Sequence, residues 1–232
     1  MNVSTTRHQF LDIAKGLAII LVVVGHVIQG SSEKFDDLLW FRVIYSFHMP
    51  LFVFLSGSVA AIAFSDDEVT QGVWASICRL KTRLSKATYR LLLPFISWCV
   101  INQLVYHQSD SIWSAVVLAF RRPDTALWFL LAIFYCIAIA AIFNVIFSVI
   151  YEFCKKMNLV KIANWVSDGR VQIVAMILIW WAIREHTPRG AGLSLIRPYF
   201  IYYLLGIGFY KYLYTKLSLW IYLVACPIFI GL

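Results

Sequence analysis

The residues of this sequence best suited to chemistry are Asp12, Lys15 and His26, which share one apolar stretch, FLDIAKGLAIILVVVGHVIQG, at positions 10–30. An α-helix turns about 100° per residue, so the eleven steps from Lys15 to His26 return to nearly the same face, about 16 Å further along the axis. An ionisable side chain in such a segment is unfavourable unless it faces the protein interior or a water-filled cavity. The spacing therefore predicts a polar stripe that is a candidate site.

A second constellation is cationic. Arg79, Arg83, Lys86 and Arg90 follow one another at spacings of four, three and four, which predicts a single basic helical face close to the inner membrane surface. An anion could dock there, and Arg83, Lys86 and Arg90 are candidate contacts for the phosphates of a soluble donor such as coenzyme A. The alternative is a basic juxtamembrane helix that touches lipid headgroups.

Two aromatic-ring residues are further candidates. His48 lies next to Pro50, which should kink its helix, and it is equally consistent with a functional residue and with a hydrogen-bonded packing residue. Trp128 is the second residue of the stretch LWFLLAIFY, where an aromatic anchor at the membrane interface is the simpler interpretation. Small residues at 56–58 offer a surface for close approach of a neighbouring helix.

The elements that must position these residues are membrane helices. The chain has 232 residues, of which 61% are hydrophobic and 14% charged, and this composition excludes a soluble domain. A bilayer core is spanned by about 20 apolar residues, which predicts an all-α polytopic transmembrane helix bundle with about seven spans. One domain covering 1–232 is expected, with spans near 10–29, 39–64, 89–106, 127–150, 171–183, 199–213 and 217–232.

The distribution of Lys and Arg predicts the orientation. With a cytoplasmic N-terminus, thirteen of the twenty Lys and Arg residues fall in cytoplasmic segments and seven in outer ones. The net charge of +8 is therefore interpreted as topology, with membrane lipid as a partner and no nucleic acid, since no nucleic-acid-binding motif is recognisable.

The remaining motifs narrow the chemistry. The five cysteines are scattered without a C-x-x-C pair, so neither a metal site nor a disulfide framework is predicted. No G-x-S-x-G, H-E-x-x-H or P-loop pattern is present.

The candidate chemistry that remains is that of a histidine accompanied by cations. A histidine can take a proton from a sugar hydroxyl, and a donor bound at the cations could extend its thioester arm toward His26. This arrangement suits acyl transfer, but it also suits a proton-coupled transporter or exporter.

The stretches FLDIAKGLAIILVVVGH, FHMPLFVFLSG, YRLLLPF, LWFLLAIF and YFIYYLLGIGFY, in this order, resemble the membrane-bound acyltransferase family three, above all its fucose 4-O-acetylase-like branch. The resemblance implies transfer of an acetyl group from acetyl-CoA to a hydroxyl of a cell-surface or secreted carbohydrate, in a bacterial cytoplasmic (inner) membrane. It also implies that Lys15 and His26 correspond to the basic residue and histidine of the family's first helix, with His26 as the catalytic group. Asp12, on the same stripe, is a further catalytic candidate. No metal is implied.

Two departures from the family pattern stand out. The family often shows two arginines three apart before its L-L-x-P stretch; here Arg90 matches the second, while the first position is Ala87, with Lys86 beside it. Family members also usually carry more membrane helices, so the domain is expected to be incomplete at its C-terminus. That length leaves a third interpretation open, in which the chain is a truncated, inactive membrane protein. The sequence leaves the oligomeric state open.

Overall fold

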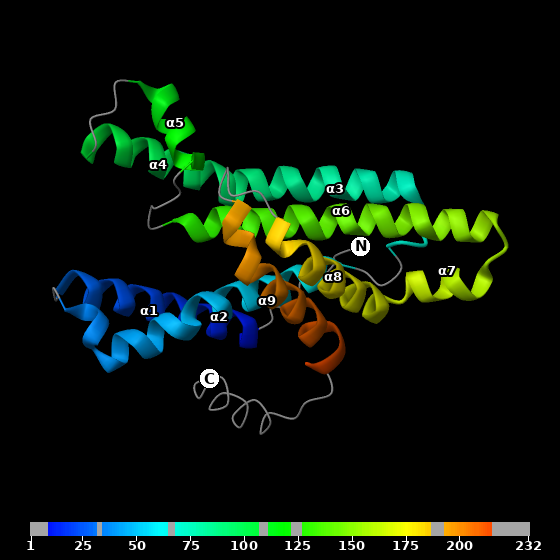
Figure 1. Ribbon diagram of the computed structural model, residues 1–232, viewed down its shortest axis with the longest axis horizontal. Helices are drawn as coiled ribbons and strands as arrows, with labels where there is room; N and C mark the ends of the chain where they lie inside the picture. Colours follow the sequence, from blue (N-terminus) through cyan, green and yellow to red (C-terminus); the bar gives the residue numbers. More distant parts are fainter. Residues whose placement is uncertain are drawn as a thin grey trace. The chain divides into compact units, whose positions relative to one another are not determined.

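The computed structural model describes residues 9–31, 34–64, 68–106, 111–121, 127–186 and 193–214. Every regular element within these ranges is helical, which confirms the all-α prediction (Figure 1). The α-helices are α1 (Gln9–Ser31), α2 (Leu39–Ala63), α3 (Val73–Ala87), α4 (Leu93–Tyr106), α5 (Ile112–Arg121), α6 (Trp128–Lys156), α7 (Val160–Ser167), α8 (Gly169–Ile183) and α9 (Ile196–Gly208). Short 3₁₀ turns and two π-helical segments, η2 (Thr88–Leu92) and η5 (Phe209–Leu213), connect or extend them.

Three of the described helices, α1, α2 and α6, are long and apolar enough to cross a membrane, and they coincide with three of the predicted spans. A fourth crossing is possible if α7 and the helical stretch Gly169–His186, which are bent by 79° at their junction, count as one span. The predicted spans 89–106, 171–183 and 199–213 fall on shorter helices or on helices joined to a π segment. The predicted span 217–232 lies outside the described residues, as do Arg7, Arg122, Arg189 and Lys216 of the charge comparison.

The chain divides into two compact units, residues 1–63 with 205–232, and residues 64–204. In the first unit α1 and α2 lie side by side (Figure 1). Leu11 and Ala18 are buried on α1 and Leu55 on α2, and Gly25 continues the seven-residue spacing on α1. A Cβ atom at Gly25 would lie 2.8 Å from Cε2 of Tyr45, so glycine is what permits this close approach of the helices.

The small-residue surface predicted at 56–58 is used within the first unit. The Ser58 hydroxyl donates to the carbonyl of Gly206 at 3.1 Å. A Cβ atom at Gly206 would lie 2.0 Å from the carbonyl oxygen of Phe54, so no larger residue fits without a backbone shift. The α2 helix runs unbroken through Pro50.

In the second unit α3 lies alongside α6 (Figure 1). The hydroxyl groups of Ser76 and Ser148, both buried, are 2.7 Å apart across this contact. Glu152 of α6 accepts a hydrogen bond at 2.8 Å from the backbone N–H of Val73. That N–H is in the first turn of α3 and has no partner within the helix, so a side chain of α6 caps α3. A separate apolar cluster joins Phe95 and Cys99 of α4 to Leu131 of α6.

Candidate active site

The polar stripe of α1 borders the helix contact and does not enter it. The buried seam runs through Leu11, Ala18 and Gly25. At about 100° per residue, Asp12 and His26 lie roughly a quarter of a turn from this seam, whereas Lys15 lies only about 40° to 60° from it. Accordingly Lys15 is partly buried, while Asp12 and His26 are exposed on the protein surface. The expectation that the stripe faces the interior is therefore met only in part, by Lys15.

Lys15 and His26 share a side of α1 but do not meet. Eleven residues of α-helix separate their Cα atoms by about 16 Å along the axis, far beyond hydrogen-bond distance. The same argument separates His26 from Asp12. Any joint action of the predicted catalytic set must therefore pass through a substrate long enough to contact both ends of the helix.

The side chains that do meet His26 are Gln29 and Tyr45. The Nδ1 atom of His26 lies 3.3 Å from Oε1 of Gln29, three residues further along α1. The Tyr45 hydroxyl, which comes from α2, donates to the same oxygen at 2.9 Å. The rings of His26 and Tyr45 are 6.4 Å apart between centroids and meet edge to face. Neither Gln29 nor Tyr45 was singled out by the sequence patterns.

His48 also contacts Tyr45. Its ring centroid is 4.7 Å from that of Tyr45, and its Nδ1 atom is 2.8 Å from the backbone carbonyl oxygen of Ile44. His48 is buried, with 5% of its surface exposed, whereas His26 is exposed. The structure thus brings the two candidate histidines to one tyrosine. The three-residue spacing of Tyr45 and His48, which places them on one helical face, is the signal that would have identified Tyr45.

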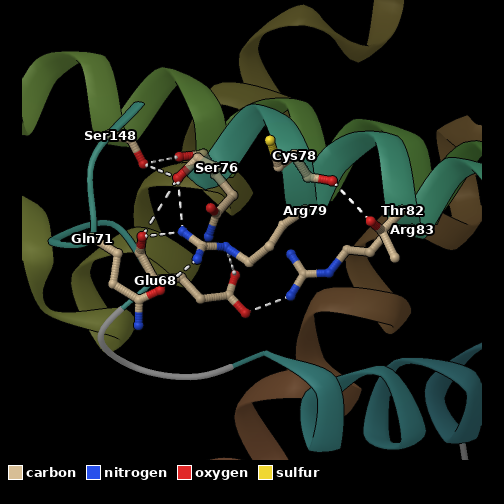
Figure 2. Close-up of polar contacts among 9 residues, drawn as sticks. Glu68, Gln71, Ser76, Cys78, Arg79, Thr82, Arg83 and Ser148 are labelled. Carbon is tan, nitrogen blue, oxygen red and sulfur yellow. Dashed lines mark hydrogen bonds and ion pairs between the residues drawn. The ribbon is translucent and has the colours of Figure 1, made fainter. Parts of the chain in front are cut away.

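The second group of candidates lies at α3 in the other unit, where Glu68 sits between two arginines (Figure 2). Its carboxylate is 2.5 Å from Nη2 of Arg83 and 4.0 Å from Nε of Arg79. Arg79 also donates to the backbone carbonyl of Glu68 and to Oε1 of Gln71, each at 2.5 Å. The guanidinium of Arg83 lies 3.7 Å from the centre of the Phe64 ring. Glu68 itself is 3% exposed, so these contacts form a largely buried charged cluster.

Two of the four cations predicted to share a basic face contact a carboxylate of the protein itself. Arg79 and Arg83 turn to Glu68, a residue that the charge pattern alone passed over. Lys86 and Arg90 are exposed. Arg90 also lies in the π-helical segment η2, whose i→i+5 hydrogen bonds widen the turn, so the α-helical spacing used for the prediction does not hold there.

Trp128 stands at the first turn of α6. Its ring is 5.4 Å from that of Tyr199, near the start of α9, and both side chains are partly buried. This contact packs the beginnings of two helices together. Within the described ranges no group of three or more His, Cys, Asp or Glu residues is placed to hold a metal ion.

The three long apolar helices α1, α2 and α6 define an integral membrane protein of the all-α class. A family model described as acyltransferase domain matches residues 8–232, and the chain belongs to this family.

Two curated relatives are similar to this chain. Both are called nodulation protein NolL: one from Mesorhizobium japonicum, 34% identical over 102 residues, and one from Sinorhizobium fredii, 32% identical over 156 residues. The first alignment covers 42% of this chain and 24% of the relative, and the second covers 62% and 39%. The chain thus aligns with well under half the length of either relative. No solved structure matches this chain.

Proposed function

We propose that this protein is an integral-membrane O-acyltransferase that moves an acetyl group from acetyl-CoA to a hydroxyl of a cell-surface or secreted carbohydrate. The observation that carries the proposal is the histidine cluster on α1 and α2, within a chain that belongs to the acyltransferase family over residues 8–232. The carbohydrate acceptor and the acetyl donor rest on the motif resemblance.

In the proposed reaction His26 acts as general base. Its ring takes the proton of the acceptor hydroxyl, and the oxygen attacks the thioester carbonyl of acetyl-CoA. The new C–O bond forms as the C–S bond breaks, and the proton passes from the ring to the departing coenzyme A sulfur. Acetyl ester and coenzyme A leave, and His26 returns to its neutral form.

Lys86 and Arg90 are the proposed contacts for the donor phosphates. Both are exposed, and a guanidinium can bind a phosphate through two parallel hydrogen bonds. Arg83 is also proposed, and there the phosphate would compete with the carboxylate of Glu68. Lys15 and Asp12 support the base or the donor through the substrate, because neither reaches His26 directly.

The role of His26 is tested by His26→Asn and His26→Gln. Both amides keep a hydrogen-bonding side chain, but neither can take up a proton near neutral pH. Positioned proton transfer is worth about 10² to 10⁴ in rate, so acetylation of carbohydrate should fall by that factor while membrane insertion stays normal. His186→Asn is the matched control, since His186 lies outside the cluster. Acetylation at close to the original rate in both His26 variants would refute the proposed mechanism.

The proposed location is a bacterial cytoplasmic membrane, with the N-terminus in the cytoplasm. The thirteen to seven division of Lys and Arg supports this orientation. A reporter fused after Lys86 should therefore read as cytoplasmic, and one fused after Asp36 as external. The reverse pattern would overturn the orientation of every loop.

A further inference from the structure

The contact between His26 and Gln29 carries information about where the proton of the imidazole ring resides. A side-chain amide oxygen is only an acceptor, so a hydrogen bond between it and His26 Nδ1 requires that Nδ1 carry the hydrogen. A neutral imidazole has one N–H, so Nε2 then bears the free lone pair. A general base needs this lone pair at the nitrogen that faces the substrate.

The Gln29 amide is also contacted from the neighbouring helix. The Tyr45 hydroxyl donates to Gln29 Oε1 at 2.9 Å, so one oxygen receives hydrogen bonds from both helices. Were the amide turned round, its NH₂ group would face His26 and Tyr45 and would favour the opposite tautomer, with the lone pair at Nδ1. The two orientations thus predict opposite chemistry at the ring.

Tyr45 is itself held by packing. Its ring stacks on Phe41 at 4.0 Å and contacts the His48 ring at 4.7 Å, and the absence of a side chain at Gly25 lets it approach α1 closely. This packing fixes the position of the Tyr45 oxygen beside Gln29. Such outer partners orient a reactive histidine and select its tautomer in other sites.

We infer that Gln29 is a positioning residue which, oriented by the Tyr45 hydroxyl, holds His26 in the Nδ1–H tautomer and leaves Nε2 as the proton-accepting atom. This inference rests on the proposed function, because the Nδ1–H tautomer has a purpose only if His26 acts as the general base. In the proposed reaction neither Gln29 nor Tyr45 makes or breaks a bond.

The test reads the tautomer directly, by nitrogen NMR of the full chain labelled with ¹⁵N-histidine, in lipid and at a pH where the rings are neutral. The spectrum of His26→Asn identifies the His26 signals by difference. The native protein should show hydrogen on Nδ1 of His26. Gln29→Glu, which offers only acceptor oxygens, should keep that tautomer, whereas Gln29→Leu and Gln29→Met should let the Nε2–H form appear.

His48 supplies an internal control for the same spectra. Its Nδ1 atom faces the backbone carbonyl of Ile44, so its tautomer should stay the same in every Gln29 variant. If Gln29→Leu changes the His48 signals, the α1–α2 pair has rearranged in that variant. The His26 tautomer in Gln29→Glu is then compared with that in Gln29→Met to decide whether Gln29 selects it.

Measurements of kcat and KM distinguish a positioning role of Gln29 from a role in substrate binding. Loss of an orienting partner typically lowers activity about 10- to 100-fold, so Gln29→Leu should lower kcat by that factor with the KM for acetyl-CoA unchanged. Gln29→Glu should restore most of kcat, and Tyr45→Phe should cause a smaller loss.

Hydrogen on Nε2 in the native protein, or an unchanged tautomer in both Gln29→Leu and Gln29→Met, would overturn the inference. The expected tautomers in a chain without acetyl transfer would instead refute the proposed function.

Discussion

Glu68 offers the sharpest test of how the second unit is held together. Its side chain is 4% exposed and that of Arg83 14%, and their closest N–O distance is 2.5 Å. Glu68→Ala would leave the Arg83 guanidinium with Phe64 but without this carboxylate. The contact from Arg79 to the Glu68 backbone carbonyl would survive, because that acceptor belongs to the main chain.

The expected magnitude follows from the burial of the pair. Removing one partner of a buried ion pair usually destabilises a protein by about 3 to 5 kcal/mol, since the other charge is left uncompensated. Glu68→Gln keeps an amide oxygen as an acceptor for Arg83, so about 1.5 to 3 kcal/mol is expected there. Replacing both partners, Glu68→Gln with Arg83→Met, should recover part of the loss, because the Arg83 charge is removed together with its carboxylate partner.

The measurement is the free energy of unfolding in mixed micelles, followed by tryptophan fluorescence during a detergent titration. Glu185→Ala is the matched control: Glu185 is 70% exposed where it pairs with Arg184, and exposed pairs are worth only about 0 to 1 kcal/mol. If Glu68→Ala lowers the free energy of unfolding no more than Glu185→Ala does, the cluster is not a stabilising feature and the reasoning is wrong.

Two further predictions concern the donor contacts and the helix packing. Arg90→Ala should weaken acetyl-CoA binding by about 1.5 to 3 kcal/mol, measured by titration, while Arg121→Ala should not; equal effects would return Arg90 to a lipid-headgroup role. Gly206→Ala should destabilise the protein by about 1 to 3 kcal/mol, because its Cβ would collide with the Phe54 carbonyl. Gly16→Ala, where nothing lies within 4 Å, should instead be neutral or stabilising by up to about 1 kcal/mol.

Much of the fold could be predicted from local patterns. Long apolar runs predicted α1, α2 and α6, because a continuous hydrophobic segment satisfies its backbone in a bilayer only as a helix or within a barrel. The position of His26 on the stripe with Lys15 followed from the helical repeat alone. The small residues around Ser58 predicted a close helix contact, which the Gly206 carbonyl provides.

The partners of the candidate residues were decided by tertiary structure. Helical periodicity specifies which residues of one helix share a face, but not which residue of another helix comes opposite them. Tyr45 reaches Gln29 because α2 packs on α1 at Gly25, and Glu68 reaches Arg83 because residues 68–72 lie along α3. The π-helical turn at Arg90 likewise changes the repeat on which the spacing argument depended. The apolar sequence thus determined where helices form, whereas side-chain packing between them determined which polar groups meet.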